Sequence, residues 1–358
     1  MKFRQCLIFI LVLYHPFSAC IASETDSTTS KSLFIYPVFF YTPETGWAYG
    51  AAMTKFSRPY KDTRPSTWNP MAVYTQKQQI IIKVTADLYG KDEKWNLISE
   101  LGYYDYPDRF YGIGSRTTTD QRESYTAKRI LFDFSPRYRI RPDLYLGFLY
   151  NFMHQRLSEL EEDGSLILKE IPGSQTGQYS GIGVLIRWDT RDNIFFPREG
   201  HYRQLAFSTF GSAIGSDYTF HRMTADIRQY LPVMERSTLA LQAFSQMIDG
   251  TAPFQILPAF GDSQKMRGYY GGRFRDNHFI TLQSEYRFFF SQRMGASVFG
   301  GIGDVARHLK DFQFSQCKYS YGFGFRMCIN PEEKMHLRVD FAYGENTSGY
   351  YVEISEAF

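Results

Sequence analysis

Residues 265–276 read Lys-Met-Arg-Gly-Tyr-Tyr-Gly-Gly-Arg-Phe-Arg-Asp and lie between two long segments in which aromatic and polar residues alternate. The glycines allow the backbone to turn tightly. The three arginines, Arg267, Arg273 and Arg275, need carboxylate partners if they are buried, because an unpaired charge inside a protein is costly. The segment therefore indicates a polar loop folded into a β-barrel.

The segment after this loop alternates with a period of two, which is the spacing of side chains on one face of a β-strand. Its apolar positions are Ile280, Leu282, Tyr286 and Phe288, and its polar positions are Thr281, Gln283, Glu285 and Arg287. Residues 142–153 and 336–343 alternate in the same way. A soluble β-sandwich and a membrane barrel both have strands with one apolar and one polar face, so this pattern alone leaves both open.

Sixteen segments have strand patterns, and no helix is indicated between them. The predicted strands are 33–40, 46–56, 68–75, 79–88, 94–106, 123–137, 142–156, 177–189, 200–212, 217–232, 237–249, 275–290, 293–303, 317–329, 333–343 and 348–358. Short turns alternate with longer loops, as in outer-membrane barrels. We predict one all-β domain over residues 32–358, a 16-stranded antiparallel transmembrane β-barrel.

The N-terminus has the three-part layout of a secretory signal peptide, a basic start, an apolar run and small residues. We predict cleavage after Ala22, so that residues 1–22 are removed and residues 23–31 form a short polar tail. Lipidation of Cys20 is the alternative, because the preceding residues loosely resemble a lipoprotein cleavage site. The rest of the chain has no apolar run of the ~18 residues that a spanning helix needs, which excludes a helical membrane protein.

The last residues place apolar side chains on one face of a closing strand and end on an aromatic residue. These residues are Tyr350, Val352, Ile354 and Phe358. The ending resembles the C-terminal signal by which bacterial outer-membrane barrels are recognised for assembly. Glu356 departs from it, since some porins have an aromatic residue there. The ending favours a bacterial outer-membrane location over a soluble sandwich.

Residues 187–200 resemble a periplasmic turn of the BamA/TamA superfamily of outer-membrane assembly and translocation proteins, the bacterial surface antigen type. The residues that match are Arg191, Asp192, Pro197 and Gly200. Proline and glycine at this spacing favour a tight reversal between two strands.

Residues 265–269 resemble the Val-Arg-Gly-Phe/Tyr motif on the sixth external loop of the same superfamily, with Arg267, Gly268 and Tyr269 as the matching residues. They lie between the eleventh and twelfth predicted strands, where the sixth external loop of a 16-stranded barrel belongs. The resemblance implies that this loop folds into the lumen.

The resemblance also implies that Arg267 bonds to carboxylates on the inner wall. The family pattern Phe-x-Asp-x-Gly has Gly301 at its aspartate position here, so another carboxylate must substitute. The candidate lumenal partners are Glu285, Asp304, Arg326, Arg338 and Asp340. The two arginines among them compete with Arg267 for the same carboxylates.

The function implied by the resemblance is insertion or translocation of outer-membrane proteins. In this family a weakly paired seam between the first and last strands opens. Pro37 in the first strand removes one ladder donor, which fits either a weakened seam or the simple capping of a strand edge. The expected partners are outer-membrane lipid, client outer-membrane proteins and separate periplasmic proteins, because the short polar tail cannot form a POTRA domain. A structural or partner-binding barrel and a plugged passive pore are the alternatives.

No motif indicates catalysis. The seven histidines show no HxxxH or HExxH spacing, and no GxSxG sequence occurs. We therefore predict a protein that is not an enzyme, with no catalytic residue, no metal site, no cofactor and no nucleic-acid partner.

Overall fold

The computed structural model describes residues 31–358 apart from 43–45, 59, 61–62 and 169. The predicted signal peptide, Cys20 and residues 23–30 of the predicted tail lie outside the described residues. Lys31, predicted as the end of the tail, is already the first residue of a strand. Among the described residues, no helix is long and apolar enough to cross a membrane.

Sixteen strands form one antiparallel sheet in which each strand pairs with the next along the barrel wall. They are β1 (Lys31–Thr42), β2 (Gly46–Ser57), β3 (Ser66–Thr75), β4 (Ile80–Tyr89), β5 (Trp95–Phe110), β6 (Glu123–Arg141), β7 (Leu144–Ser158), β8 (Gly177–Asp189), β9 (Gly200–Phe210), β10 (Phe220–Met234), β11 (Ser237–Gly250), β14 (His278–Phe289), β15 (Met294–Ala306), β16 (Lys318–Asn330), β17 (Met335–Gly344) and β18 (Thr347–Ile354). The predicted all-β, 16-stranded fold is confirmed, with every predicted strand present.

Smaller elements occupy the connections. A two-stranded hairpin of β12 (Ala259–Phe260) and β13 (Phe274–Arg275) lies between β11 and β14. The short 3-10 helices are η1 (Lys91–Glu93), η2 (Thr119–Gln121), η3 (Ser212–Ile214), η4 (Leu309–Asp311) and η5 (Phe314–Gln316). The hairpin belongs to the connection 251–277, which we call loop six.

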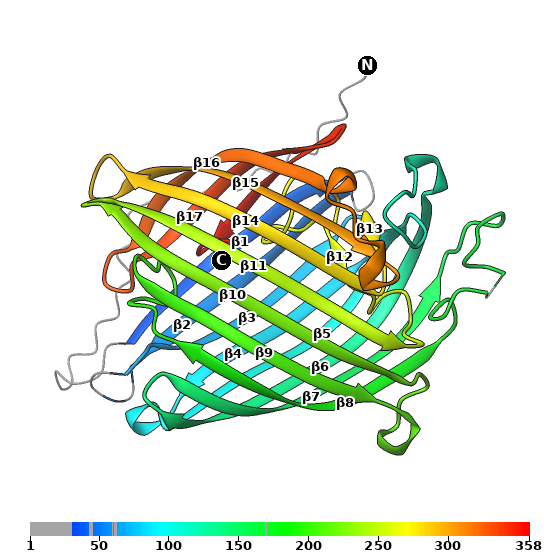
Figure 1. Ribbon diagram of the computed structural model, residues 1–358, viewed down its shortest axis with the longest axis horizontal. Helices are drawn as coiled ribbons and strands as arrows, with labels where there is room; N and C mark the ends of the chain where they lie inside the picture. The colour runs from blue at the N-terminus through cyan, green and yellow to red at the C-terminus, as the bar shows by residue number, and fades with distance from the viewer. Residues whose placement is uncertain (1–30, 43–45, 59, 61–62, 169) are drawn as a thin grey trace.

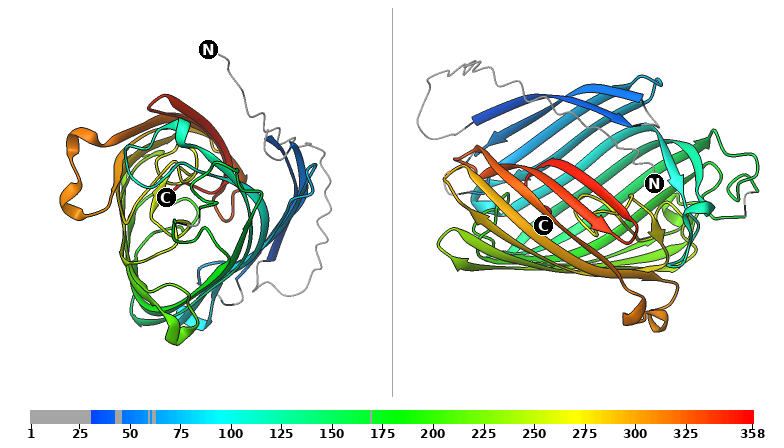
Figure 2. Two further views of the ribbon diagram at one scale, coloured as in Figure 1. Left: turned by 90° about the vertical axis from the view of Figure 1, so that its right-hand side faces the viewer. Right: turned by 90° about the horizontal axis from the view of Figure 1, so that it is seen from above.

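The sheet curls into a barrel whose strands are strongly tilted (Figure 1). The view along the barrel shows loop six inside the wall (Figure 2). The longer connections gather at one end, here called the loop end, and the shorter ones at the turn end. In outer-membrane barrels these ends are extracellular and periplasmic, respectively. Among the pairings of the described residues, β1 pairs with β2 alone and β18 with β17 alone, so the sheet has a seam between β1 and β18.

The two faces of the wall have opposite chemistry. Leu282 and Val298 are each about half exposed on the outside, whereas Thr281, Glu285 and Arg287 on the inside are buried. Apolar side chains that point outward from a barrel wall with a polar interior require lipid rather than water around them. The alternation in the sequence thus corresponds to a polar interior and a lipid-facing exterior.

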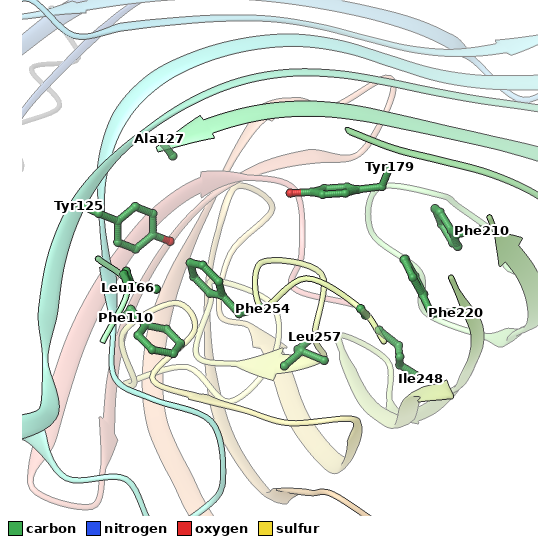
Figure 3. Close-up of a cluster of buried hydrophobic side chains, with 11 residues drawn as sticks. Phe110, Tyr125, Ala127, Leu166, Tyr179, Phe210, Phe220, Ile248, Phe254 and Leu257 are labelled. Atoms are coloured by element: carbon green, nitrogen blue, oxygen red, sulfur yellow. The ribbon is translucent and has the colours of Figure 1, made fainter. Parts of the chain in front are cut away.

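The interior at the loop end is filled by an apolar cluster, which we call the cap cluster. It joins wall residues to residues of the connections, namely Phe110, Tyr125, Ala127, Leu166, Tyr179, Phe210, Phe220, Ile248, Ala252, Phe254 and Leu257 (Figure 3). Phe254 of loop six is fully buried, and its ring centroid lies 4.7 Å from that of Phe110 and 5.7 Å from that of Tyr125. Loop six is therefore packed against the wall as a protein core is packed.

The last strand differs from the prediction, because β18 ends at Ile354 rather than at the final residue. Ser355 has a φ of 80°, in the left-handed region that turns the chain out of the strand direction. Its backbone N–H donates to the carbonyl of His336 at 2.8 Å, which holds the turn in place. Residues 355–358 form a tail that leaves the wall.

A charge placed on the lipid-facing surface should destabilise the barrel according to its depth. Val184 lies near the middle of β8 and is well exposed, so we expect Val184→Arg to cost about 2–4 kcal/mol of unfolding free energy. Met234, the exposed last residue of β10, serves as the control, and we expect Met234→Arg to cost about 0–1 kcal/mol. Urea titration in lipid vesicles measures both, and equal losses would contradict the assigned orientation.

Candidate functional site

The centre of the lumen is occupied by the side chain of Arg267, which is 2% exposed. One guanidinium nitrogen, Nη2, donates to Oε2 of Glu285 at 2.6 Å, and the other, Nη1, donates to Oδ2 of Asp340. Glu285 lies on β14 and Asp340 on β17, so loop six is bonded to two separate strands of the wall.

Both carboxylates are shared with other arginines. Arg326 Nη2 and Arg287 Nε donate to Oε1 of Glu285 at 2.7 and 3.0 Å. Arg326 Nη1 and Arg338 Nη1 donate to Asp340, each at 2.7 Å. Arg326 Nε also donates to Glu356 at 2.8 Å. We call this set the lumenal ion network; its members are Arg267, Glu285, Arg287, Arg326, Arg338, Asp340 and Glu356.

Phe299 and Gly324 shape the space around Arg267 and its partners. The Arg267 guanidinium carbon lies 3.4 Å from the centroid of the Phe299 ring, which covers one face of the cation. Gly324 on β16 leaves space for the ion pairs, because a Cβ there would lie 2.0 Å from Asp340 Oδ1 and 2.7 Å from Arg326 Nη1. Any side chain at position 324 would have to displace the network.

The rest of the loop-six motif contacts β17 and β18. Gly268 has a φ of 102°, and a Cβ on it would lie 2.8 Å from the backbone of Tyr343, so only glycine fits. Its N–H donates to the hydroxyl of Tyr351 at 2.8 Å. The Tyr269 hydroxyl accepts from the N–H of Glu345 at 2.9 Å. The motif is thus held by the last two strands of the barrel as well as by the ion network.

Gly301 replaces the aspartate of the family pattern, and a different side chain contacts loop six beside it. Gly301 is in register with Gln283 of β14, and a Cβ there would lie 3.0 Å from Gln283 Cγ. Gln283 accepts from the N–H of Met266 at 2.9 Å and donates to the carbonyl of Gln264 at 3.0 Å. A neutral amide therefore holds the loop backbone beside this position, while Glu285 and Asp340 contact the cation.

The candidate partner Asp304 was wrongly grouped with these residues. Its Oδ1 accepts from Lys318 Nζ at 2.8 Å, and none of the contacts of Asp304 among the described residues reaches Arg267, Arg326 or Arg338. Asp304 lies near the loop end of β15, several residues beyond the level of Glu285, and the adjacent β16 supplies its partner. Sequence spacing alone did not show that Asp304 and Glu285 lie at different positions along the barrel axis.

Sequence reasoning missed three members of the site. Arg287 lies two residues after Glu285 on the polar face of β14, so the same alternation predicts that both point inward. Phe299 occupies the phenylalanine position of the Phe-x-Asp-x-Gly pattern, but that pattern did not show that its ring would cover Arg267. Glu356 was identified as a departure from the C-terminal pattern, and its contact with Arg326 shows why a carboxylate at that position is useful.

The C-terminal tail turns into the lumen, which corrects the prediction that Phe358 shares one face of the closing strand with Tyr350, Val352 and Ile354. Those three residues are in register with Phe341, Val339 and Leu337 on the outer face of β17. Phe358 instead lies buried beside Tyr230 and Ala240, and its backbone oxygen accepts from Arg287 Nη2 at 2.8 Å. The left-handed backbone at Ser355 produces this change of side.

The β8–β9 connection is also different from the tight reversal predicted from Pro197 and Gly200. Residues 190–199 form a longer loop, which we call the turn insert. The Asn193 side chain accepts from the N–H groups of Phe195 and Phe196, each at 2.8 Å, and Asp192 accepts from that of Arg198 at 2.8 Å. These local hydrogen bonds stabilise the longer loop. Gly200, with a φ of 94°, begins β9.

The turn insert enters the lumen at the turn end. The Phe196 ring centroid lies 5.2 Å from that of Phe289 in β14 and 4.5 Å from that of His336 in β17. These strands are far from β8 and β9 in the strand order of the sheet. The ring of Phe195 packs against Phe56 of β2 at 5.5 Å. This connection therefore contacts β2 on one side of the seam and β14 and β17 on the other.

Arg191 fixes the base of the turn insert. Its Nε and Nη2 donate to the two oxygens of Asp189 at 2.8 and 2.9 Å, and Arg64 Nη1 donates to the same carboxylate at 2.8 Å. Burial lowers the pKa of the Arg191 guanidinium, but the hydrogen bond and charge of Asp189 outweigh burial and leave this pKa above its ordinary value. Arg191 is charged at every physiological pH.

One ion pair spans the seam at the turn end. Arg58, directly after β2, donates to both carboxylate oxygens of Glu333 in the β16–β17 turn at 3.2 and 2.7 Å. The Glu333 carbonyl accepts from Asn193 of the turn insert at 3.2 Å. These contacts, with Phe195 on Phe56, form a clasp between strands that do not pair with each other.

The Omp85 superfamily domain matches residues 55–358. The chain belongs to the Omp85 superfamily. Barrels of this superfamily are outer-membrane proteins, and the predicted resemblance to BamA and its relatives is confirmed. No match is found among curated protein sequences.

Solved Omp85 barrels share this fold at low sequence identity. BamA from Haemophilus ducreyi lacking POTRA domains 1-3 is 13% identical, with a TM-score of 0.60 over 92% of this chain and 70% of that chain. CdiB from Acinetobacter baumannii is 11% identical, with a TM-score of 0.56 over 92% and 66% of the two chains. CdiB from Escherichia coli is 8% identical, with a TM-score of 0.58 over 93% and 63%. The chain thus spans about two thirds of the length of these structures.

Removing the Arg267 guanidinium should release loop six from the lumen of this Omp85 barrel. Loss of one partner of a buried ion pair costs about 3–5 kcal/mol, and we expect the lower end because Glu285 and Asp340 keep other arginines. Trypsin added at the loop end should then cut Arg267→Ala after Lys265, a site that the control variant also keeps, while the parent barrel resists. Arg273→Ala is the matched control, because Arg273 bonds to the neutral side chain and carbonyl of Thr117. Equal cleavage of both variants would refute the anchor role.

Proposed function

We propose that this protein assists the insertion or translocation of other outer-membrane proteins, after export through an N-terminal signal peptide. The observation that carries the proposal is the seam, at which the edges of β1 and β18 have no mutual pairing among the described residues. An unpaired strand edge is a template on which another β-strand can add. A client strand is the partner whose backbone chemistry fits such an edge.

Two sets of internal contacts stabilise the strands near the seam without pairing β1 with β18. The lumenal ion network ties loop six and the C-terminal tail to β14, β16 and β17, so the strands next to β18 form one rigid wall. The clasp of Arg58 and Glu333 bridges the seam at the turn end through a pair whose arginine is partly exposed. The Glu333 side chain is buried, so the pair holds more firmly than a surface pair, but it is a single ion pair in place of a ladder of backbone hydrogen bonds.

The proposed role involves binding and strand pairing without chemical catalysis, and it requires no cofactor. Its partners are outer-membrane lipid, client outer-membrane proteins and separate periplasmic proteins that deliver them.

Depletion of the protein should lower the steady-state levels of several other outer-membrane proteins. A plasmid copy of the parent or of Arg273→Ala should restore those levels, whereas Arg267→Ala should not, because it frees loop six from the wall beside the seam. Immunoblots of outer-membrane fractions measure the levels, with a heat-modifiability assay to show that each variant folds. Unchanged levels on depletion would eliminate the assembly role.

A plugged passive pore is the second candidate, favoured by the cap cluster that fills the loop end. We expect little ion conductance from the parent barrel in planar bilayers. If the protein is a plugged pore, Phe254→Ala, which costs about 3–5 kcal/mol in a packed core, and Arg267→Ala should both raise the conductance. A pore role fails if neither variant conducts more than the parent.

A further inference from the structure

The connection between β15 and β16 has two strongly exposed apolar side chains. Phe314 is 84% exposed, the highest value among the large hydrophobic side chains in the described part of the protein, and Leu309 is 54% exposed. They lie on the short helices η5 and η4 of residues 307–317, which we call loop seven. Single exposed apolar residues are common on proteins, so the placement of these two side chains and their neighbours decides what they contact.

Loop seven points in a different direction from the β7–β8 connection. It projects sideways from the barrel wall beside the loop-end tips of β15 and β16, as both views of Figure 2 show. The β7–β8 connection, by contrast, extends along the barrel axis away from the strands. A sideways projection at the ends of membrane-spanning strands lies over the lipid that surrounds the barrel.

The apolar residues of loop seven continue the lipid-facing surface of the wall. Tyr319 and Tyr321 follow the loop on the outer face of β16, each about half exposed, and their rings stack with centroids 6.3 Å apart. Aromatic residues at this height form the girdle that marks the membrane interface of outer-membrane barrels. Phe314 and Leu309 extend that girdle outward from the wall.

The charges of loop seven complement an anionic surface. Arg307, His308 and Lys310 are exposed, and the single acidic residue among them is Asp311. Asp311 is engaged within the loop, where its carboxylate accepts from the backbone N–H of His308 at 3.2 Å. Basic residues beside exposed leucine and phenylalanine are the composition of segments that bind at a membrane surface.

We propose that loop seven is a membrane-interface anchor that inserts Phe314 and Leu309 among the lipids beside the barrel, while Arg307 and Lys310 bind anionic lipid phosphates. The anchor fixes the height and tilt of the barrel on the side of β15 and β16. It holds the loop end of β15 and β16 at the membrane surface whether or not the seam between β1 and β18 opens.

A spin label at position 314 tests the proposal. Phe314→Cys is labelled in the full-length protein whose native cysteines are replaced by serine, and the barrel is reconstituted into vesicles of phosphatidylcholine with phosphatidylglycerol. Label accessibility is measured to oxygen, which concentrates in the bilayer, and to a water-soluble nickel chelate. Leu168→Cys on the β7–β8 connection is the matched control, because Leu168 is an exposed apolar residue on a connection that points away from the membrane.

We expect the label at position 314 to favour oxygen over nickel and the label at position 168 to favour nickel. The double variant Arg307→Gln and Lys310→Gln should increase nickel access at position 314 in vesicles with phosphatidylglycerol and leave it unchanged in pure phosphatidylcholine. Heat modifiability shows that each labelled protein is folded.

Three results would overturn the proposal. Equal nickel access at positions 314 and 168 shows that loop seven lies in water. Protection at position 314 that appears only at high protein density identifies a second protein copy as the occupant. Protection that is identical with and without the two basic residues in anionic vesicles removes the role of lipid phosphate.

Discussion

The buried contact of Arg267 with Glu285 and Asp340 is the interaction on which the interior of this barrel depends. An arginine inside a polar but confined lumen must be paired, and each of its carboxylates is in turn shared with further arginines. Loop six, β14, β16, β17 and the C-terminal tail are therefore joined by one set of charges. Because the charges are mutually required, the tail and the loop hold each other in place.

The two ends of the lumen are closed by different physical means. At the loop end, the cap cluster buries aromatic rings from the wall against loop six, which is hydrophobic packing. At the turn end, the turn insert places Phe196 against Phe289 and His336 and is anchored by the charge pair of Arg191 and Asp189. Also at the turn end, the seam is bridged by Arg58 and Glu333. Among the described residues, β1 and β18 share no strand pairing, so the seam lacks the ladder hydrogen bonds found between the other neighbouring strands.

Strand positions were predictable because alternation is a local property, readable from residues two apart. The inward direction of Glu285 and Asp340 follows from the same rule. The choice of Asp340 over Asp304 did not follow, since it depends on how far each residue lies along its tilted strand. The turn of the chain at Ser355 was equally hidden, because serine does not demand a left-handed conformation. The bridge from Phe195 to Phe56 joins segments whose sequences give no sign of contact.

The sequence by itself determined that this protein is a 16-stranded barrel with a polar inside, and that loop six carries an arginine in need of carboxylates. The tertiary structure alone decided which carboxylates those are, since Glu285 is 18 residues from Arg267 and Asp340 is 73. It also decided that Phe358 lies inside and that the turn insert spans the lumen. The physical reason is that periodicity shows on which side of the sheet a side chain lies. The tilt of the strands and the curvature of the sheet determine which inward side chains come into contact.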